Sequence, residues 1–372
     1  MNSIKRWWTK KKIITFLILV LIGIVSMLFV THNQMLYHDT IAKVTTVQTD
    51  KPQKQVDTFQ NVDHLTDQKL HLVLMNGDKK GQTLTITNQY SDSQATDQKY
   101  KVGDQIFVKL HTYDGKLGGT IKGFKRDSVL VFLAWLVVCL LVMSMAFKGA
   151  MALFSVLLNA TLFLFAVKLD LKWQGNHVML IFGVLAVIFS VLTLLLVLGP
   201  SKRMLATLGA TVLGTSISML ISLAIFALTQ EKGMFYESME YVTQVPRPLF
   251  LAETLLGSLG AVMDESTDIV ATLFELKSID PKVSRGQLFL SGRKVGQSIM
   301  GPLVNVLFLI FMTDTFISAL LYIKNGNSWG YTFAMNMSLG TVQSLISGIG
   351  IVLAIPVASG LAALLLGRRR AA

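Results

Sequence analysis

Long apolar runs alternate with short polar segments along most of the chain. An uncharged run covers residues 13–30, and apolar runs resume at residue 129 after a long polar segment. Each run approaches or exceeds the roughly 20 residues that a helix needs to cross a bilayer. The pattern predicts eight spanning helices, over 13–30, 129–147, 150–167, 177–199, 204–228, 249–275, 299–323 and 331–366.

The polar segment 31–127 has the pattern of a small β domain. Thr83–Thr87 alternates polar and apolar residues, as a half-buried strand does. Further strand candidates are Ile106–Leu110 and Val44–Val47, and hairpin-turn residues occur at Asn76-Gly77 and Tyr113-Asp114-Gly115. We expect a small all-β barrel or sandwich, similar in type to an OB-fold.

The predicted fold class is therefore an α-helical polytopic membrane protein with about eight transmembrane helices and an all-β extracytoplasmic domain after the first helix. We interpret 13–30 as an uncleaved anchor, because no small-x-small cleavage site follows it. The expected organisation is a cytoplasmic basic tail (1–12), an anchor (13–30), an extracytoplasmic β domain (31–127), a multipass membrane domain (128–367) and a second cytoplasmic basic tail (368–372).

Composition and charge agree with this class. The chain is 52% hydrophobic and 15% charged, with a net charge of +12. The basic residues concentrate in segments that an N-in, C-in topology places in the cytoplasm, including the 276–298 connection, as the positive-inside rule requires. The excess is therefore a topology signal rather than a nucleic-acid signal. Cys139 is the only cysteine, which excludes intramolecular disulfides.

Five of the six histidines lie in the predicted β domain, but their spacing does not match a zinc site. We favour solvated histidines over a metal or pH-sensing site, and predict neither metal nor cofactor. The chain also lacks the GxxxxGK[ST], GxSxG and HExxH patterns, so we expect no enzyme activity and no ATP-driven transport by this chain alone.

The predicted span 249–275 contains acidic residues at membrane depth. Carboxylates there are costly unless they face protein or water, and they commonly mark ion or proton pathways. At about 100° per residue, four of the five acids and two glycines share one face, and Glu265 lies beyond its edge. The ion- or proton-coupling candidates are Asp264, Asp268, Glu265, Glu275 and Glu253. Two of these acids also have a non-functional interpretation. Glu275 could lie at a water-exposed helix end, and Glu253 could pair with Arg247.

The final run, 331–366, exceeds one crossing, and we expect its first third to be re-entrant, interfacial or broken. Asn336, Gln343 and Ser347 share one helical face, which predicts a polar surface within the membrane. Asp314 lies on the preceding span, where function and a water-exposed helix end are both open. Candidate helix breaks are Gly257, Gly260, Gly348, Gly350 and Pro356.

Three segments, Leu256–Asp264, Ser291–Pro302 and Ile349–Pro356, resemble the YibE/F family of bacterial multipass membrane proteins. The resemblance covers roughly residues 125–366, and the long polar segment before them suits the longer, YibE-like members. It implies a multipass protein of the bacterial plasma membrane with an unspecified transport role. The acidic run Met263–Asp268 is also distantly similar to the membrane core of SecD/SecF and RND-type exporters.

Two functions follow from these observations. The first is a YibE/F-type permease, ion-coupled transporter or export factor that uses intramembrane carboxylates to move an unknown solute with protons or cations. The second is a non-transporting assembly factor or receptor whose outer domain binds an envelope or secreted partner. Beyond the lipid bilayer, a second membrane subunit or a homo-oligomer is an open possibility. Intramembrane aspartyl chemistry is disfavoured, because it needs acids on facing helices, whereas Asp264 and Asp268 lie on one helix.

Overall fold

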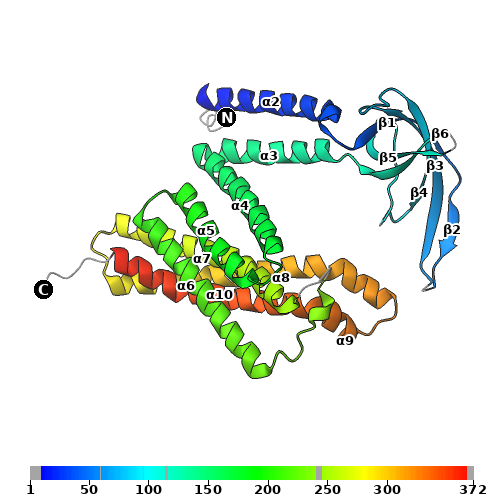
Figure 1. Cartoon of the computed structure of the whole chain (residues 1–372). Helices are drawn as coiled ribbons and strands as arrows, with labels where there is room; N and C mark the ends of the chain where they lie inside the picture. Colours follow the sequence, from blue (N-terminus) through cyan, green and yellow to red (C-terminus); the bar gives the residue numbers. More distant parts are fainter. Residues whose placement is uncertain (1–9, 59, 95, 114–115, 240–244, 367–372) are drawn as a thin grey trace, which may run out of the picture. The chain divides into compact units, whose positions relative to one another are not determined.

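A computed structural model describes residues 10–58, 60–94, 96–113, 116–239 and 245–366. The chain divides into two compact units, Met1–Ala150 and Met151–Ala372. Most of the basic tail 1–12 and all of the tail 368–372 lie outside the described residues. The helices are α2 (Lys10–Thr31), α3 (Asp127–Met145), α4 (Phe147–Lys172), α5 (Val178–Leu198), α6 (Lys202–Thr229), α7 (Pro246–Ile279), α8 (Arg285–Lys324), α9 (Trp329–Thr332) and α10 (Ser338–Leu366) (Figure 1).

In the described part of the chain, seven helical segments are long and apolar enough to cross a membrane. They correspond to the predicted spans within a few residues, except that 285–298 joins the predicted 299–323 in one helix. The eighth predicted span is α7, which lies outside this set because its carboxylates interrupt the apolar sequence. Their length and apolar composition are those of membrane-spanning helices.

The first unit contains an antiparallel β half-barrel. Its strands are β1 (Thr40–Thr49), β2 (Gln53–Val56), β3 (Val62–Leu74), β4 (Thr83–Ser91), β5 (Gln105–Tyr113) and β6 (Lys116–Phe124). Their order is β2-β3-β1-β5-β6, with β4 on β3. The three predicted strands lie within β4, β5 and β1, because alternation places their apolar residues in one core. Of the predicted hairpin turns, Asp114-Gly115 lies outside the described residues.

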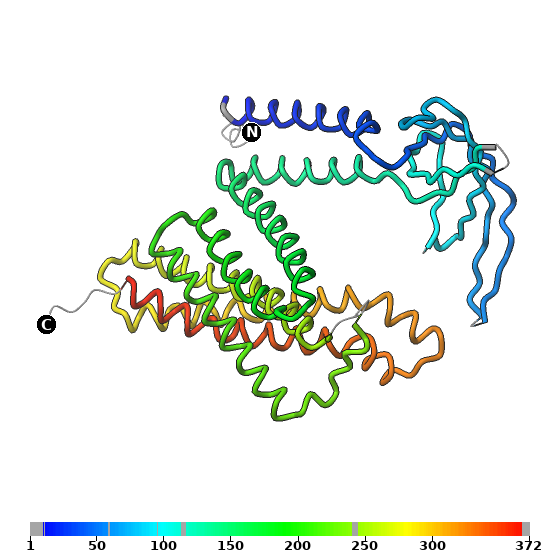
Figure 2. The backbone as a smooth tube through the Cα atoms, in the orientation of Figure 1, coloured from blue at the N-terminus to red at the C-terminus, as the bar shows by residue number. Residues whose placement is uncertain are grey.

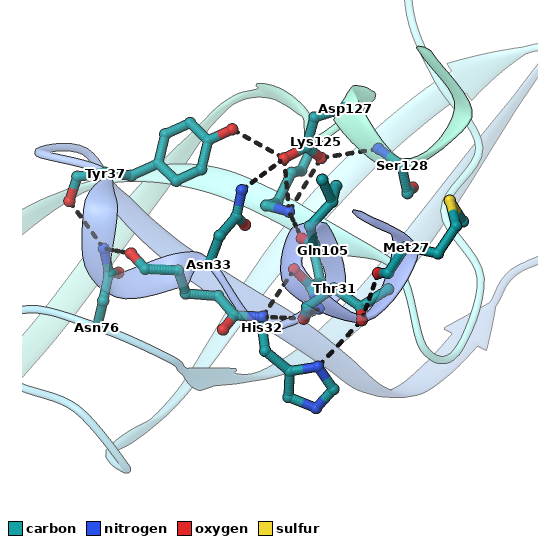
Figure 3. A network of polar contacts seen from close by, with 12 residues as sticks. Met27, Thr31, His32, Asn33, Tyr37, Asn76, Gln105, Lys125, Asp127 and Ser128 are labelled. Atoms are coloured by element: carbon teal, nitrogen blue, oxygen red, sulfur yellow. Dashed lines mark hydrogen bonds and ion pairs between the residues drawn. The ribbon is translucent and has the colours of Figure 1, made fainter. Parts of the chain in front are cut away.

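A buried lysine joins the half-barrel to its two flanking helices (Figure 3). Lys125 Nζ donates to the Val30 carbonyl at 2.7 Å, at the C-terminal end of α2, where a positive charge is favourable. The same ammonium lies 2.8 Å from the Asp127 carboxylate, in the first turn of α3. Tyr37 donates to Asp127 at 2.8 Å, and this hydrogen bond raises the pKa of the Tyr37 phenol. The strands and both helices therefore meet at one charged centre.

The helices α2 and α3 pack side by side (Figure 1). Trp135 Nε1 donates to the Leu19 carbonyl at 2.8 Å, which joins α3 to the middle of α2. The indole occupies the space beside Gly23, where a Cβ would lie 2.4 Å from the ring. A glycine is required there because any side chain would displace the tryptophan.

The second unit is built around α10, which packs against α6, α7 and α8 (Figure 2). The Val262 side chain of α7 is fully buried between Gly214 of α6 and Gly350 of α10. A Cβ at Gly350 would lie 2.7 Å from Val262 Cγ2. Ser218 of α6 also donates to the Ile346 carbonyl of α10 at 2.7 Å. Such close backbone approach is typical of helices that associate within a membrane.

Two expectations about helix continuity are wrong. First, α7 and α10 run without interruption through Gly257, Gly260, Gly348, Gly350 and Pro356, so these residues do not break their helices. At Gly350 and Gly257 the missing side chain instead makes room for a neighbouring helix. The irregularity near the start of the final run lies at Phe333–Met337, a π-helical segment (η3) between α9 and α10.

Second, the stretch 276–298, predicted as a cytoplasmic connection, is mostly helical. A capping box of Ser284 and Gln287 begins α8 at Arg285, and the helix continues for 40 residues, with Pro302 inside it. Residues 285–298 of the predicted connection therefore form the first third of α8.

The glycine packing predicts that the same substitution destabilises the protein at Gly350 but not at Gly348. We expect Gly350→Ala to lower the free energy of unfolding by about 1–3 kcal/mol, because its methyl group would overlap Val262. Gly348→Ala is the matched control, since a Cβ there meets nothing within 4 Å and both changes gain the same helix propensity. Thermal unfolding in detergent micelles measures the difference. Equal melting temperatures of the two variants would contradict the assigned contact.

The charged centre predicts a second stability difference. Lys125→Met removes donors to Val30 and Asp127, and we expect a loss of about 1–3 kcal/mol because the Val30 carbonyl loses this donor and the Asp127 carboxylate loses its cationic partner. Lys122→Met is the control, because the Lys122–Asp39 pair is half-exposed and such pairs contribute about 0–1 kcal/mol. Hydrogen exchange of residues 30–38 should accelerate in the first variant only. Unchanged exchange in Lys125→Met would show that this centre does not hold the junction.

Candidate functional site

A polar cavity of about 780 Å³ lies between α7, α8 and α10. Its described lining contains two carboxylates, one amide-rich helical face and no Lys, Arg or His. The polar residues that line it are Ser238, Glu253, Asp314, Thr315, Ser318, Asn336, Gln343, Ser344 and Ser347. Because α8 and α10 are both long and apolar enough to cross a membrane, this polar surface lies between two candidate spans. Polar groups in that setting require a water-filled or ligand-filled space.

The predicted polar face of the last span lines this cavity. Asn336, Gln343 and Ser347 all contribute to its wall, together with Gly340 between them. The Gln343 amide occupies the space left by Gly257 of α7, where a Cβ would lie 3.0 Å from Nε2. Glu253 lies one turn before Gly257 on the same helix and also lines the cavity. The acid and glycine face predicted on α7 and the polar face predicted on α10 therefore line the same cavity.

Asp314 of α8, for which function and a water-exposed helix end were both open, also lines the cavity. Two acids on different helices, Glu253 and Asp314, therefore share one space. Asn336 Nδ2 donates to the Thr315 carbonyl of α8 at 3.1 Å. Asn336 lies within η3, and π-helical segments occur frequently at functional sites. The signal for Asp314 was an acid in an otherwise apolar span, but the neighbouring helix that completes the site is not visible in sequence.

Arg247 does not neutralise Glu253. Its Nε instead pairs with Glu231, which follows α6. Tyr236 Oη donates to the other oxygen of Glu231 at 3.1 Å, and burial together with this hydrogen bond raises the pKa of Tyr236 to about 12. The pairing of Glu253 with Arg247, which the sequence left open, therefore does not occur. Glu253 faces the cavity without Arg247.

The five acidic candidates occupy three different environments, of which the cavity wall holds Glu253. Glu265 is fully buried, and neither carboxylate oxygen has a hydrogen-bond partner among the described residues. The hydroxyls of Ser266 on α7 and Thr215 on α6 are likewise buried without a partner there. Asp264, Asp268 and Glu275 lie on an exposed face of the second unit. Helical periodicity correctly placed the exposed acids on one face of α7. Glu265, which lies beyond the edge of that face, is the acid that the neighbouring helices bury.

The histidines of the β domain show ordinary polar contacts. His64 Nδ1 lies 3.0 Å from Asp92 at the surface, and His71 Nδ1 lies 3.0 Å from the Thr85 hydroxyl. Within the described ranges, no group of three or more His, Cys, Asp or Glu residues is placed to hold a metal ion. The candidate site is therefore the polar cavity of the membrane helices.

Among the described residues, the fold combines seven helices that are long and apolar enough to cross a membrane with a β half-barrel between α2 and α3. The chain belongs to the YibE/F family: residues 133–368 match the YibE/F-like protein family, and residues 35–124 match the YibE/F family N-terminal domain. A search of curated proteins and a search of solved structures found no match. The family resemblance predicted from the glycine-rich acidic helix is thus confirmed.

The cavity predicts different chemical accessibility at neighbouring positions of α10. In a background without Cys139, we expect Gln343→Cys to react with a charged, water-soluble thiosulfonate at least about tenfold faster than Leu345→Cys. Gln343 lines the polar cavity, whereas Leu345 is 53% exposed on the apolar side of the helix and would face lipid. Labelling rates in proteoliposomes measure this. Comparable rates would mean that the polar cavity contains no water.

Proposed function

We propose that this chain is a membrane transporter that couples movement of a solute to a proton or cation, with both termini in the cytoplasm of a bacterial cell. The observation that carries the proposal is the polar cavity between spanning helices, with Glu253 and Asp314 in its wall. Ligand sites are typically cavities of about 300–1,000 Å³ with a few convergent polar groups. A protein that only anchored an outer domain would gain nothing from such a cavity.

Glu265 supports the coupling part of the proposal. An ionised carboxylate without hydrogen bonds is strongly disfavoured away from water, so this group needs a proton or a bound cation. Neutralisation by a proton costs least, because it removes the charge altogether. Glu265 lies three turns after Glu253 on the same continuous helix, which gives a direct mechanical link between the cavity and the buried acid. We therefore assign solute binding to the cavity and ion coupling to Glu265.

The test is proton flux in proteoliposomes under an imposed pH gradient, read with a pH-sensitive dye. We expect Glu265→Gln to reduce flux at least about tenfold, because an amide cannot exchange a proton, while the isosteric side chain preserves packing. Glu275→Gln is the matched control, since it makes the same change at an exposed position of the same helix. Normal proton flux in Glu265→Gln would show that Glu265 has no role in coupling. Equal losses of flux in Glu265→Gln and Glu275→Gln would show a general defect.

A second function is supported by the charged centre around Lys125. It fixes the half-barrel to α2 and α3, which suits a domain that presents a binding surface to an envelope or secreted partner. In that assembly-factor or receptor function, removal of residues 40–120 abolishes activity, whereas Glu265→Gln has no effect. Transport predicts the larger effect for Glu265→Gln, so the two variants discriminate between the proposals.

A further inference from the structure

A second cavity of about 660 Å³ lies between α8 and α10, and it differs in chemistry from the first. Its wall is almost wholly apolar, with Val304 and Phe308 on α8 and Ile349 and Val352 on α10. Val352 is 48% exposed at its rim, so the groove is open on one side of the second unit. Between two spanning helices, an open apolar groove meets acyl chains rather than water.

The two cavities share one lining residue, Ser344. This buried residue of α10 lines both the polar cavity and the apolar groove. The polar space lies on the Gln343 side of the helix and the apolar space on the Leu345 side, so a ligand that occupies both must have a polar end and an apolar end. Gly348 widens the groove at this point, because the space where its Cβ would lie is open for 4 Å.

The charge of the polar cavity selects the head group. Glu253 and Asp314 are acidic, and the described lining includes no basic side chain. An ammonium group has three donors and no acceptor, which matches carboxylate and amide oxygens, whereas a carboxylate or phosphate head would be repelled. A neutral hydroxyl head would form hydrogen bonds but would gain no attraction from the two acids.

From this geometry we propose that the solute is an amphiphile from the membrane, with a cationic amine head group in the polar cavity and an apolar chain in the groove between α8 and α10. This inference rests on the proposed function, whose substrate class it names. It makes the open side of the groove the entry route, because the chain can enter from lipid without leaving an apolar environment.

The experiment uses three photoreactive probes with the same diazirine-bearing alkyl chain, ending in an amine, a hydroxyl or a carboxylate. Each is added to the full chain in proteoliposomes, irradiated, and mapped by peptide mass spectrometry. We expect the amine probe to label residues 300–308 and 344–353 at least about fivefold more than the carboxylate probe. Unlabelled alkylamine should compete. Equal labelling by all three probes would overturn the proposal and show that the groove holds bulk lipid only.

Matched variants locate the two ends of the ligand. Gly348→Leu places a side chain in the groove, starting from a Cβ that meets nothing within 4 Å, and should reduce amine labelling several-fold. Gly360→Leu makes the same change in the same helix, also in open space but outside both linings, and should leave labelling unchanged. If Gly348→Leu unfolds, Val352→Phe fills the same groove from its rim. Equal labelling of groove-filled and control variants would overturn the placement of the chain.

The head-group assignment has its own test. The double variant Glu253→Gln/Asp314→Asn should abolish the preference for the amine over the hydroxyl probe while leaving hydroxyl labelling intact. A preference that survives would overturn the role of the two acids. Labelling does not require flux, so the two proposals fail separately. Selective labelling without flux would support the proposed ligand and contradict transport. Flux without selective labelling would support transport and contradict an amphiphilic substrate.

Discussion

The membrane unit depends on how closely α10 approaches α6 and α7. Lipid tails are as apolar as leucine, so helices in a bilayer gain little from burying apolar side chains and depend on tight contact. Val262 provides that contact by lying between Gly214 and Gly350, two positions without a Cβ. Farther along the same helices, Ala206, Ala210, Ala358 and Ala362 extend the small-residue interface. The polar cavity lies between α7, α8 and α10, where carboxylate, amide and hydroxyl side chains line it.

The same packing separates the acids of α7 into two groups. A continuous helix presents Asp264 and Glu265 about 100° apart, so a neighbour that covers one leaves the other exposed. Burial of Glu265 without a partner is costly and must be offset by the surrounding contacts or by protonation. Glu253 avoids that cost because it opens onto a polar space. Membrane carboxylates with these two environments suit two tasks, ion coupling and solute recognition.

The half-barrel is attached to its helices by one buried charge rather than by a flexible linker. Lys125 satisfies a helix-terminal carbonyl, and Asp127 receives hydrogen bonds from a lysine, a tyrosine and an asparagine. Gln34 and Asn76 extend this network into the strands, and Asn76 alone donates to three backbone carbonyls. Any movement of the half-barrel would therefore be transmitted to the paired helices α2 and α3 within this unit.

The sequence by itself determined the spans, the β domain and the polar face of the last helix. Apolar length, strand alternation and helical periodicity are local properties, which is why the predicted spans agree with the observed helices within a few residues, except at the start of α8. Only the tertiary structure decided that Gly350 packs rather than breaks its helix, since a missing Cβ serves either purpose. It also decided that Glu265 is enclosed and that Asp314 joins Glu253, because periodicity defines a face but not the neighbour that covers it.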